Sequence, residues 1–174
     1  MTGLRGVAAL VLAATAAFTA AAAPAPDPGA TTVILVRHAE KVSKNRYASL
    51  SSLGWRRAEA LVSELAPLRP AALYSSDLKR AQQTLSPLAA VAGLPLLVRP
   101  YGDESALGPE ILARHRGRTV VVCGHSGTLS RIAKGIGYNG EFPDVRDFDR
   151  IWTLTIPSDG LPVSLAETRQ HFAP

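Results

Sequence analysis

Three short stretches of the sequence end an apolar run with residues that could bind and transfer a phosphoryl group. Arg37 and His38 follow the run TTVILV, Arg80 lies in SSDLKRAQQT directly after AALY, and His125 follows RTVVVC as part of GHSGT. Guanidinium groups bind phosphate oxygens through paired hydrogen bonds, and a neutral imidazole can act as a nucleophile. These residue types therefore indicate phosphoryl-transfer chemistry.

The elements that must position these residues follow from the alternation of short apolar runs with longer helical patterns. This alternation predicts an α/β domain with a mostly parallel sheet. Strands are expected at 31–38, 71–76, 95–100 and 118–125, helices at 53–68, 77–93, 105–117 and 126–137, and a closing hairpin at 150–157 and 161–170. Prolines on both sides place the third strand at an edge of the sheet.

The three polar stretches are expected to meet because the carboxyl ends of strands in an open α/β sheet share one crevice. A helix beginning directly after the fourth strand would add free backbone N–H groups near Ser126 and Gly127, which favour an anion. Positive charges around His38 would keep its imidazole neutral and its lone pair free. Taken singly, Arg80 could instead pair with Asp77 on the helix surface, and His125 could be an ordinary strand-end histidine.

Two local predictions concern the helix at 77–93. Asp77 is placed to cap the start of this helix, and Gly93 to close it. Pro87 falls in its interior and is expected to kink or divide it, because proline removes a backbone donor.

Four motifs, in order, give the sequence a resemblance to a known family. VRHAE, LSSLGWRRA, SSDLKRAQQT and GHS, spread from about Val33 to Ile132, resemble the signatures of the histidine phosphatase superfamily, which includes the phosphoglycerate mutases. The resemblance implies a three-layer α/β/α sandwich and no metal or cofactor. It also implies that His38 becomes phosphohistidine, that Arg37 and Arg80 clamp the phosphoryl oxygens, and that His125 completes the pocket.

Two positions depart from the family pattern. Ala39 stands where the family usually has glycine, a change expected to be tolerated. The carboxylate that would protonate the leaving oxygen is expected in YGDESAL, where Glu104 is preferred over Asp103. Alternatively, Asp103 or Ser105 serves only to cap the next helix. Glu40, although close to the nucleophile, is expected to form a local pair.

The N-terminus reads as a secretory signal. Residues 1–23 carry one positive charge, Arg5, followed by an alanine-rich apolar stretch, and cleavage is expected between Ala20 and Ala25. Residues 24–31, rich in proline, are expected to be a flexible tether, and residues 32–174 the catalytic domain. The predicted location is therefore secreted or periplasmic, without stable membrane insertion after cleavage.

The amino-acid composition limits the kinds of molecule that the protein is expected to bind. The formal net charge is +5, but the basic residues are scattered and aromatic residues make up only 6% of the chain, which argues against nucleic acid. A small phosphorylated substrate accounts for the charge. The only cysteine, Cys123, lies within an apolar strand and is expected to be a buried core residue.

These observations predict a phosphatase that hydrolyses a phosphate monoester through phosphohistidine on His38. A mutase is disfavoured because its diphosphorylated cofactor should be absent outside the cytoplasm and the chain is short for a closing lid. Two alternatives are a phosphohistidine protein phosphatase and a non-catalytic module that binds phosphate or another anion. Specificity is expected in the loops 42–49 and 139–149.

Overall fold

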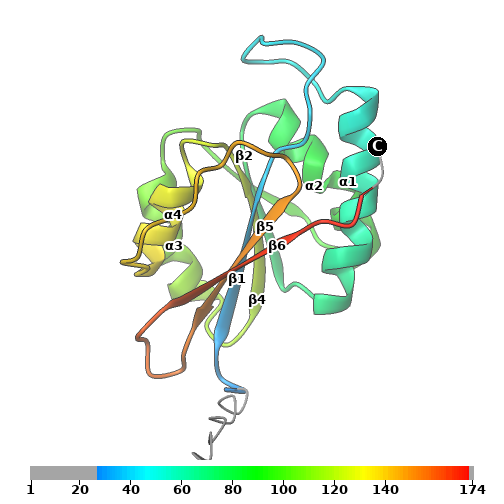
Figure 1. Ribbon diagram of the computed structural model, residues 1–174. Helices are drawn as coiled ribbons and strands as arrows, with labels where there is room; N and C mark the ends of the chain where they lie inside the picture. The colour runs from blue at the N-terminus through cyan, green and yellow to red at the C-terminus, as the bar shows by residue number, and fades with distance from the viewer. Residues whose placement is uncertain (1–26, 173–174) are drawn as a thin grey trace, which may run out of the picture.

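The computed structural model describes residues 27–172 (Figure 1). Its centre is a six-stranded sheet with the order β3-β2-β4-β1-β5-β6. The strands are β1 (Thr31–Arg37), β2 (Ala72–Ser76), β3 (Leu96–Arg99), β4 (Thr119–Gly124), β5 (Arg150–Ile156) and β6 (Ser164–Arg169). The first four strands are parallel to one another, β5 runs antiparallel to β1, and β6 runs antiparallel to β5, so the predicted mostly parallel sheet with a closing hairpin is confirmed.

Four α-helices cover the two faces of this sheet. They are α1 (Ser52–Leu65), α2 (Lys79–Ala92), α3 (Glu104–Arg114) and α4 (Leu129–Ile136), and a short 3-10 helix, η1 (Ala66–Leu68), follows α1. In Figure 1, α3 and α4 lie on one side of the sheet and α1 and α2 on the other. The three-layer α/β/α sandwich predicted from the sequence is therefore present.

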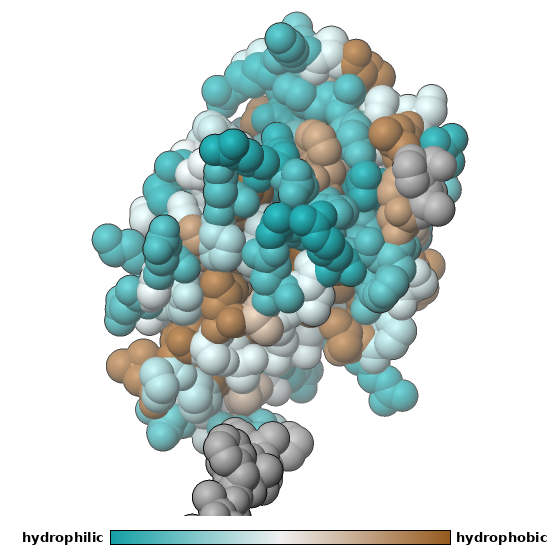
Figure 2. Space-filling model, viewed as in Figure 1, coloured by the Kyte–Doolittle hydropathy of each residue, from teal (hydrophilic) through white to brown (hydrophobic). Residues whose placement is uncertain are grey.

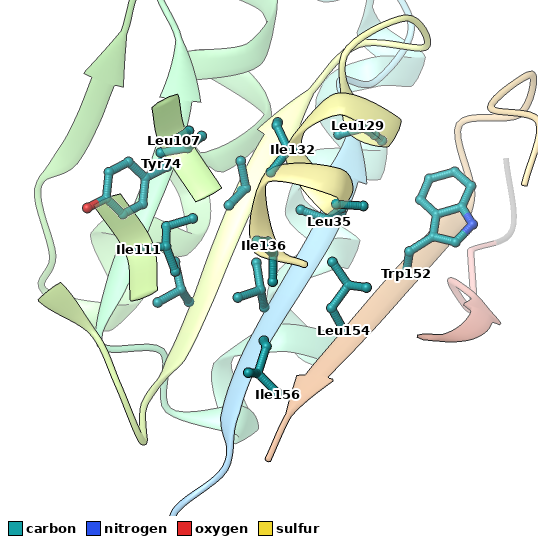
Figure 3. Close-up of a cluster of buried hydrophobic side chains, with 14 of the residues drawn as sticks. Leu35, Tyr74, Leu107, Ile111, Leu129, Ile132, Ile136, Trp152, Leu154 and Ile156 are labelled. Carbon is teal, nitrogen blue, oxygen red and sulfur yellow. The ribbon is translucent and has the colours of Figure 1, made fainter. Parts of the chain in front are cut away.

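Strand alternation explains why both faces are apolar. Val33 and Leu35 in β1 point into one core, which contains the inner sides of α3 and α4 (Figure 3), whereas Ile34 and Val36 point into the other core, against α1 and α2. Successive side chains on a strand face opposite sides, so a strand covered on both faces must be apolar throughout. This explains why the run of residues before Arg37 is continuously apolar.

The neighbouring strands β1 and β4 form a topological switch point. Helix α1, which follows β1, packs on one face of the sheet, and α4, which follows β4, packs on the other. The segments that follow β1 and β4 therefore diverge at the carboxyl ends of these strands and leave a crevice. Such a crevice is the usual ligand site of open α/β sheets. Figure 2 shows hydrophilic side chains over the upper part of the molecule, where these strand ends and their loops lie.

The start of α4 differs from the prediction. The helix begins at Leu129, with Thr128 at its N-cap, and residues 125–128 form a turn. The Thr128 hydroxyl accepts a hydrogen bond from the His125 N–H (2.8 Å), and the His125 carbonyl accepts from the Thr128 N–H (2.9 Å). This local pairing competes with the helix and delays its start.

Helix α2 differs from the prediction at its start, and Pro87 does not divide it. Its N-cap is Leu78, and the carboxylate of Asp77 instead accepts a hydrogen bond from the Tyr101 N–H (3.0 Å). Pro87 does not divide the helix, which runs unbroken from Lys79 to Ala92. The Ser86 hydroxyl donates to the Gln83 carbonyl (3.0 Å), the acceptor that a residue other than proline at 87 would have used.

The first strand begins where it was predicted, at Thr31, which is also the last residue of the predicted tether. Before it, the Asp27 carboxylate accepts a hydrogen bond from the Ser158 N–H (2.7 Å). The predicted signal, residues 1–23, lies outside the described residues. Within residues 27–172, no helix is long and apolar enough to cross a membrane.

The crossing of α3 and α4 requires glycine at position 108. A Cβ atom added to Gly108 would lie 2.3 Å from the carbonyl carbon of Gly135. We expect Gly108→Ala to lower the free energy of unfolding by about 1–3 kcal/mol, measured by urea denaturation, because the backbones of α3 and α4 must move apart to accept the methyl group. At Gly127 a Cβ would meet nothing within 4 Å, so Gly127→Ala is the matched control. Equal stability of the two variants would contradict this account of the helix crossing.

Candidate active site

The carboxyl ends of β1, β2 and β4 open into a cleft that contains the predicted chemical residues. Arg37, His38, Arg80 and His125 all line it. The register explains the pairing of the histidines, because Arg37 lies opposite Gly124 in the parallel ladder and the next residue of each strand is a histidine. The two imidazole rings lie 5.1 Å apart between centroids.

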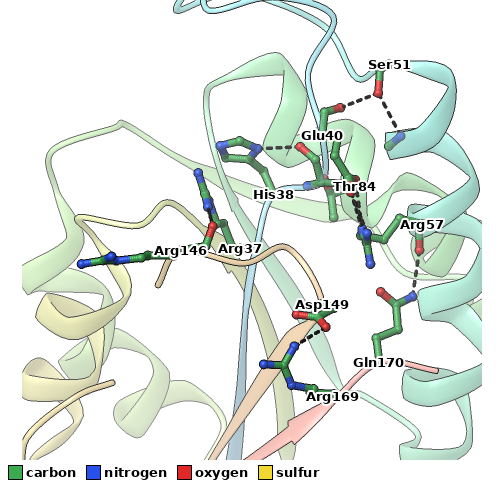
Figure 4. A network of polar contacts seen from close by, with 12 residues as sticks. Arg37, His38, Glu40, Ser51, Arg57, Thr84, Arg146, Asp149, Arg169 and Gln170 are labelled. Atoms are coloured by element: carbon green, nitrogen blue, oxygen red, sulfur yellow. Dashed lines mark hydrogen bonds and ion pairs between the residues drawn. The ribbon is translucent and has the colours of Figure 1, made fainter. Parts of the chain in front are cut away.

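The ring of His38 is held in one orientation. Its Nδ1 lies 2.7 Å from the Ala39 carbonyl oxygen (Figure 4). The backbone N–H of His38 donates to the Gly124 carbonyl (3.0 Å). The Ala39 N–H in turn donates to the Thr84 hydroxyl (3.0 Å). A carbonyl oxygen can only accept, so Nδ1 carries the proton and Nε2 keeps its lone pair.

The electrostatics of the cleft keep His38 neutral. Burial is the main cause that lowers its pKa, from 6.5 to about 3, and the nearby Arg80, His125 and Arg37 lower it further, although the hydrogen bond to Ala39 opposes the shift. Only 5% of the residue is exposed. The imidazole is thus a free nucleophile at neutral pH.

The two arginines place positive charge in the interior. One Nη of Arg37 donates to the Arg146 carbonyl, and the guanidinium lies 4.2 Å from the centre of the Phe148 ring. Arg80, which is 8% exposed, donates to the Arg46 carbonyl. In residues 27–172, neither guanidinium lies within 4 Å of a carboxylate, and the Nε atom of each is buried without a partner.

His125 is fixed between Arg80 and Ser76. Its Nδ1 lies 3.2 Å from an Nη of Arg80, which can only donate, so Nδ1 accepts and the ring proton resides on Nε2, 2.8 Å from the Ser76 hydroxyl. Burial, followed by the charges of Arg80 and Arg37, lowers the pKa of His125 to about 3. The alternative in which Arg80 pairs with Asp77 does not hold, because Arg80 faces the cleft.

Two aromatic side chains that the sequence analysis did not single out flank the cleft. Tyr101, just after β3, lies 5.1 Å from the His125 ring, and Phe148, just before β5, lies 5.9 Å from the His38 ring. Tyr101 follows the same strand-end rule that identified the other residues. Phe148 lies within the loop 139–149, and Ser43 and Lys44 come from the loop 42–49, so both predicted specificity loops border the cleft.

The structure does not bring Glu104 into this cleft. Its carboxylate accepts hydrogen bonds from the Gly102 N–H (3.0 Å) and from Arg131 (3.1 Å), and it lines a small cavity of about 20 Å³ that shares His125 with the cleft. Asp103 lines the same cavity and occupies the N-cap position of α3 without a side-chain capping bond. A general acid must lie within hydrogen-bond reach of the leaving oxygen, so neither position supports that role.

The remaining polar residues behave as supports. Both oxygens of Glu40 accept hydrogen bonds from Arg57 (2.6–2.9 Å; Figure 4), as the expected local pair.

Cys123 is buried, and burial raises the pKa of its thiol to about 12. His115 is half-buried with its Nε2 3.0 Å from the Tyr74 hydroxyl. In residues 27–172, no cluster of three or more His, Cys, Asp or Glu side chains could hold a metal ion.

Solved structures with the same fold are phosphatases by name. The mycobacterial glucosyl-3-phosphoglycerate phosphatase, complexed with VO3, is 16% identical with a TM-score of 0.64, over 82% of this chain and 99% of that chain. The protein histidine phosphatase SixA, complexed with tungstate, is 19% identical with a TM-score of 0.63, over 80% and 97%. Phosphoserine phosphatase from Entamoeba histolytica is 16% identical with a TM-score of 0.60, over 82% and 100%.

The sequence comparison names the family. The model of the histidine phosphatase superfamily (branch 1) matches residues 33–109, which include Arg37, His38 and Arg80. No curated protein matches the sequence significantly. By this matched segment and by its fold, the chain is similar to members of the histidine phosphatase superfamily.

The neutrality of His38 can be measured directly. We expect its ring resonance, assigned by its loss in His38→Gln, to stay at the neutral position in NMR spectra from pH 8 down to pH 5, because its pKa is lowered to about 3. A titration midpoint near the ordinary value of 6.5 would contradict this electrostatic picture.

The same pKa shift carries a stability consequence with a definite sign. Between pH 6.5 and about 3 the unfolded chain binds a proton at His38 that the folded chain does not, so the free energy of unfolding falls as the pH falls through this window. Replacing His38 with glutamine should reduce this acid sensitivity, measured by urea denaturation at pH 7 and pH 4.5. An unchanged pH dependence would argue against a neutral buried imidazole.

Proposed function

We propose that the protein is a phosphatase that hydrolyses a phosphate monoester through a phosphohistidine intermediate on His38. One observation carries the proposal: a neutral imidazole with a free Nε2 shares a cleft with two guanidinium groups, that of Arg80 buried and that of Arg37 half-buried, which have no carboxylate partner in the described part of the chain. A phosphate group supplies the negative charge that these guanidinium groups lack.

The first step is attack of His38 Nε2 on phosphorus. A bond forms between Nε2 and phosphorus while the bond from phosphorus to the leaving oxygen breaks, and the electron pair goes to that oxygen. Arg37 and Arg80 stabilise the charge on the non-bridging oxygens, where it is concentrated in the transition state. The phosphorylated ring becomes cationic, and the bond from its Nδ1–H to the Ala39 carbonyl (2.7 Å) stabilises that charge.

The second step is hydrolysis of phosphohistidine. Water attacks phosphorus, the bond to Nε2 breaks, and inorganic phosphate leaves with the ring again neutral. Regeneration is favoured because burial and the neighbouring arginines disfavour a charged imidazole.

The names of the structural relatives support this reaction class. The structures that resemble this chain include phosphatases complexed with VO3, tungstate and inorganic phosphate, anions of the kind this cleft would accept. The likeness to the protein histidine phosphatase SixA also supports the second candidate, in which the substrate is phosphohistidine on a protein. Export through the predicted signal at residues 1–23 would place the activity in the periplasm or outside the cell, where a small phosphorylated substrate fits better.

Replacement of the nucleophile separates an enzyme from a binding module. We expect His38→Ala to lower kcat for p-nitrophenyl phosphate by at least about 10³-fold and to abolish acid-labile phosphate trapped by rapid quench. Phosphate affinity, measured by calorimetry, should change little, because Arg37 and Arg80 remain. Wild-type protein that binds phosphate and hydrolyses no phosphate ester would show a non-catalytic anion-binding module instead.

The role of Glu104 is tested in the same assay. From its pairing with Arg131, we expect Glu104→Gln to lower kcat less than about tenfold and Asp103→Asn to behave likewise. If Glu104 were the general acid, kcat would fall by about 10²- to 10⁴-fold and the alkaline limb of the pH profile would disappear. Thermal denaturation of both variants controls for the loss of the ion pair.

A further inference from the structure

The rim of the cleft carries three cations besides Arg37 and Arg80. Lys41 and Lys44 line the cleft directly. The guanidinium of Arg46 lies 4.8 Å from the centre of the Tyr101 ring, which contacts the ring of His125. In the described part of the chain, none of these three cations lies within 4 Å of a carboxylate.

The segment that bears these cations is attached to the domain. Lys41 and Leu50 form an isolated β-bridge, and the Leu50 N–H donates to the side chain of Gln83 in α2 (2.9 Å). Burial, then the charges of Arg80 and Arg37, lowers the pKa of Lys41, so its ammonium group lies within the same electrostatic field. The cations at the rim therefore act on whatever the two arginines bind.

The charge in this region exceeds what a simple ester needs. A phosphate monoester carries a charge of about −2, which two guanidinium groups already balance. Cations without counter-ions in a partly desolvated cleft favour a ligand with a second anionic group.

The cleft also lacks an available carboxylic acid. Among the described residues, Glu40 is the one carboxylate that lines it, and Arg57 binds both of its oxygens. Glu104 is paired with Arg131, and both it and Asp103 line the small cavity on the other side of His125 and not the cleft itself. A leaving group in this cleft must therefore depart without a proton from a carboxylic acid.

This combination selects among leaving groups. The alkoxide that departs from an alkyl phosphate is strongly basic and needs a proton donor, whereas a departing phosphate is stable as an anion near neutral pH. Lysines beside the departing oxygen stabilise an anion that stays charged. Both observations, the surplus cations and the missing acid, point to the same chemistry.

Extending the proposed phosphatase function, we propose that the preferred substrates are phosphoanhydrides, compounds in which the transferred phosphoryl group is joined through oxygen to a second phosphate. His38 Nε2 attacks the terminal phosphorus between Arg37 and Arg80. The bond from that phosphorus to the bridging oxygen breaks, the electron pair remains on the departing phosphate, and Lys41 and Lys44 bind it. Water then hydrolyses phosphohistidine as above, so no oxidant, reductant or further co-reactant is needed.

The test compares leaving groups on one enzyme. Steady-state kcat/KM is measured for inorganic pyrophosphate, glycerol 3-phosphate and p-nitrophenyl phosphate, without added divalent metal. We expect pyrophosphate to exceed glycerol 3-phosphate by at least about 10²-fold, the usual contribution of a general acid. p-Nitrophenyl phosphate reports the attack step, because nitrophenolate leaves without a proton.

Variants then assign the effect to the rim. In Lys41→Gln/Lys44→Gln, the ratio of kcat/KM for pyrophosphate to that for p-nitrophenyl phosphate should fall about tenfold. Arg56→Gln/Lys134→Gln removes two positive charges from exposed helix positions outside the cleft, and its ratio should stay at the wild-type value.

The outcomes separate the two proposals. Comparable kcat/KM for glycerol 3-phosphate and pyrophosphate, or an unchanged ratio in Lys41→Gln/Lys44→Gln, would overturn the phosphoanhydride preference while p-nitrophenyl phosphate turnover still supports a phosphatase. Turnover of none of the three compounds would overturn the phosphatase proposal, and this inference with it.

Discussion

The rest of the site depends on two guanidinium groups, that of Arg80 buried and that of Arg37 half-buried, which have no carboxylate partner in the described part of the chain. A buried charge costs free energy that an opposite charge ordinarily offsets. For Arg37 and Arg80, the carbonyls of Arg146 and Arg46 and the ring of Phe148 offset only part of that cost. The uncompensated field attracts an anion and, together with burial, keeps both histidines neutral. Anion binding and nucleophile activation are therefore two consequences of one arrangement.

The fold maintains this arrangement through backbone register. β1 and β4 are adjacent, parallel and aligned, so His38 and His125 emerge side by side. The helices that follow these strands pack on opposite faces, which keeps backbone out of the space between them. Arg80 reaches the same space from the first turn of α2, and the hydroxyl of Thr84, one turn later, binds the Ala39 N–H. The geometry of the nucleophile thus depends on three elements distant in sequence.

The sequence was sufficient for the parts of the molecule that local patterns determine. An apolar run that ends in Arg37 and His38 predicts both the strand and its polar end. The four cleft residues predicted from the strand ends lie together as expected. The start of α4 was missed because it depends on the Thr128 hydroxyl, and the continuity of α2 through Pro87 because it depends on Ser86. Local hydrogen bonds of this kind depend on side-chain conformation, which the hydrophobic periodicity of the sequence does not encode.

The location of the acidic residues follows from the same electrostatic constraint. A free carboxylate beside Arg37 or Arg80 would form an ion pair, cancel part of the field and raise the pKa of the nearby imidazoles. Glu40, the residue best placed to do this, is held by Arg57 on α1, and Glu104 is held by Arg131 on α4. Each arginine thereby removes a competing anion from the cleft. Among the described residues, the carboxylate that lines this cleft is therefore held by an arginine, and the charged side chains of the cleft that lack an ionic partner are cations.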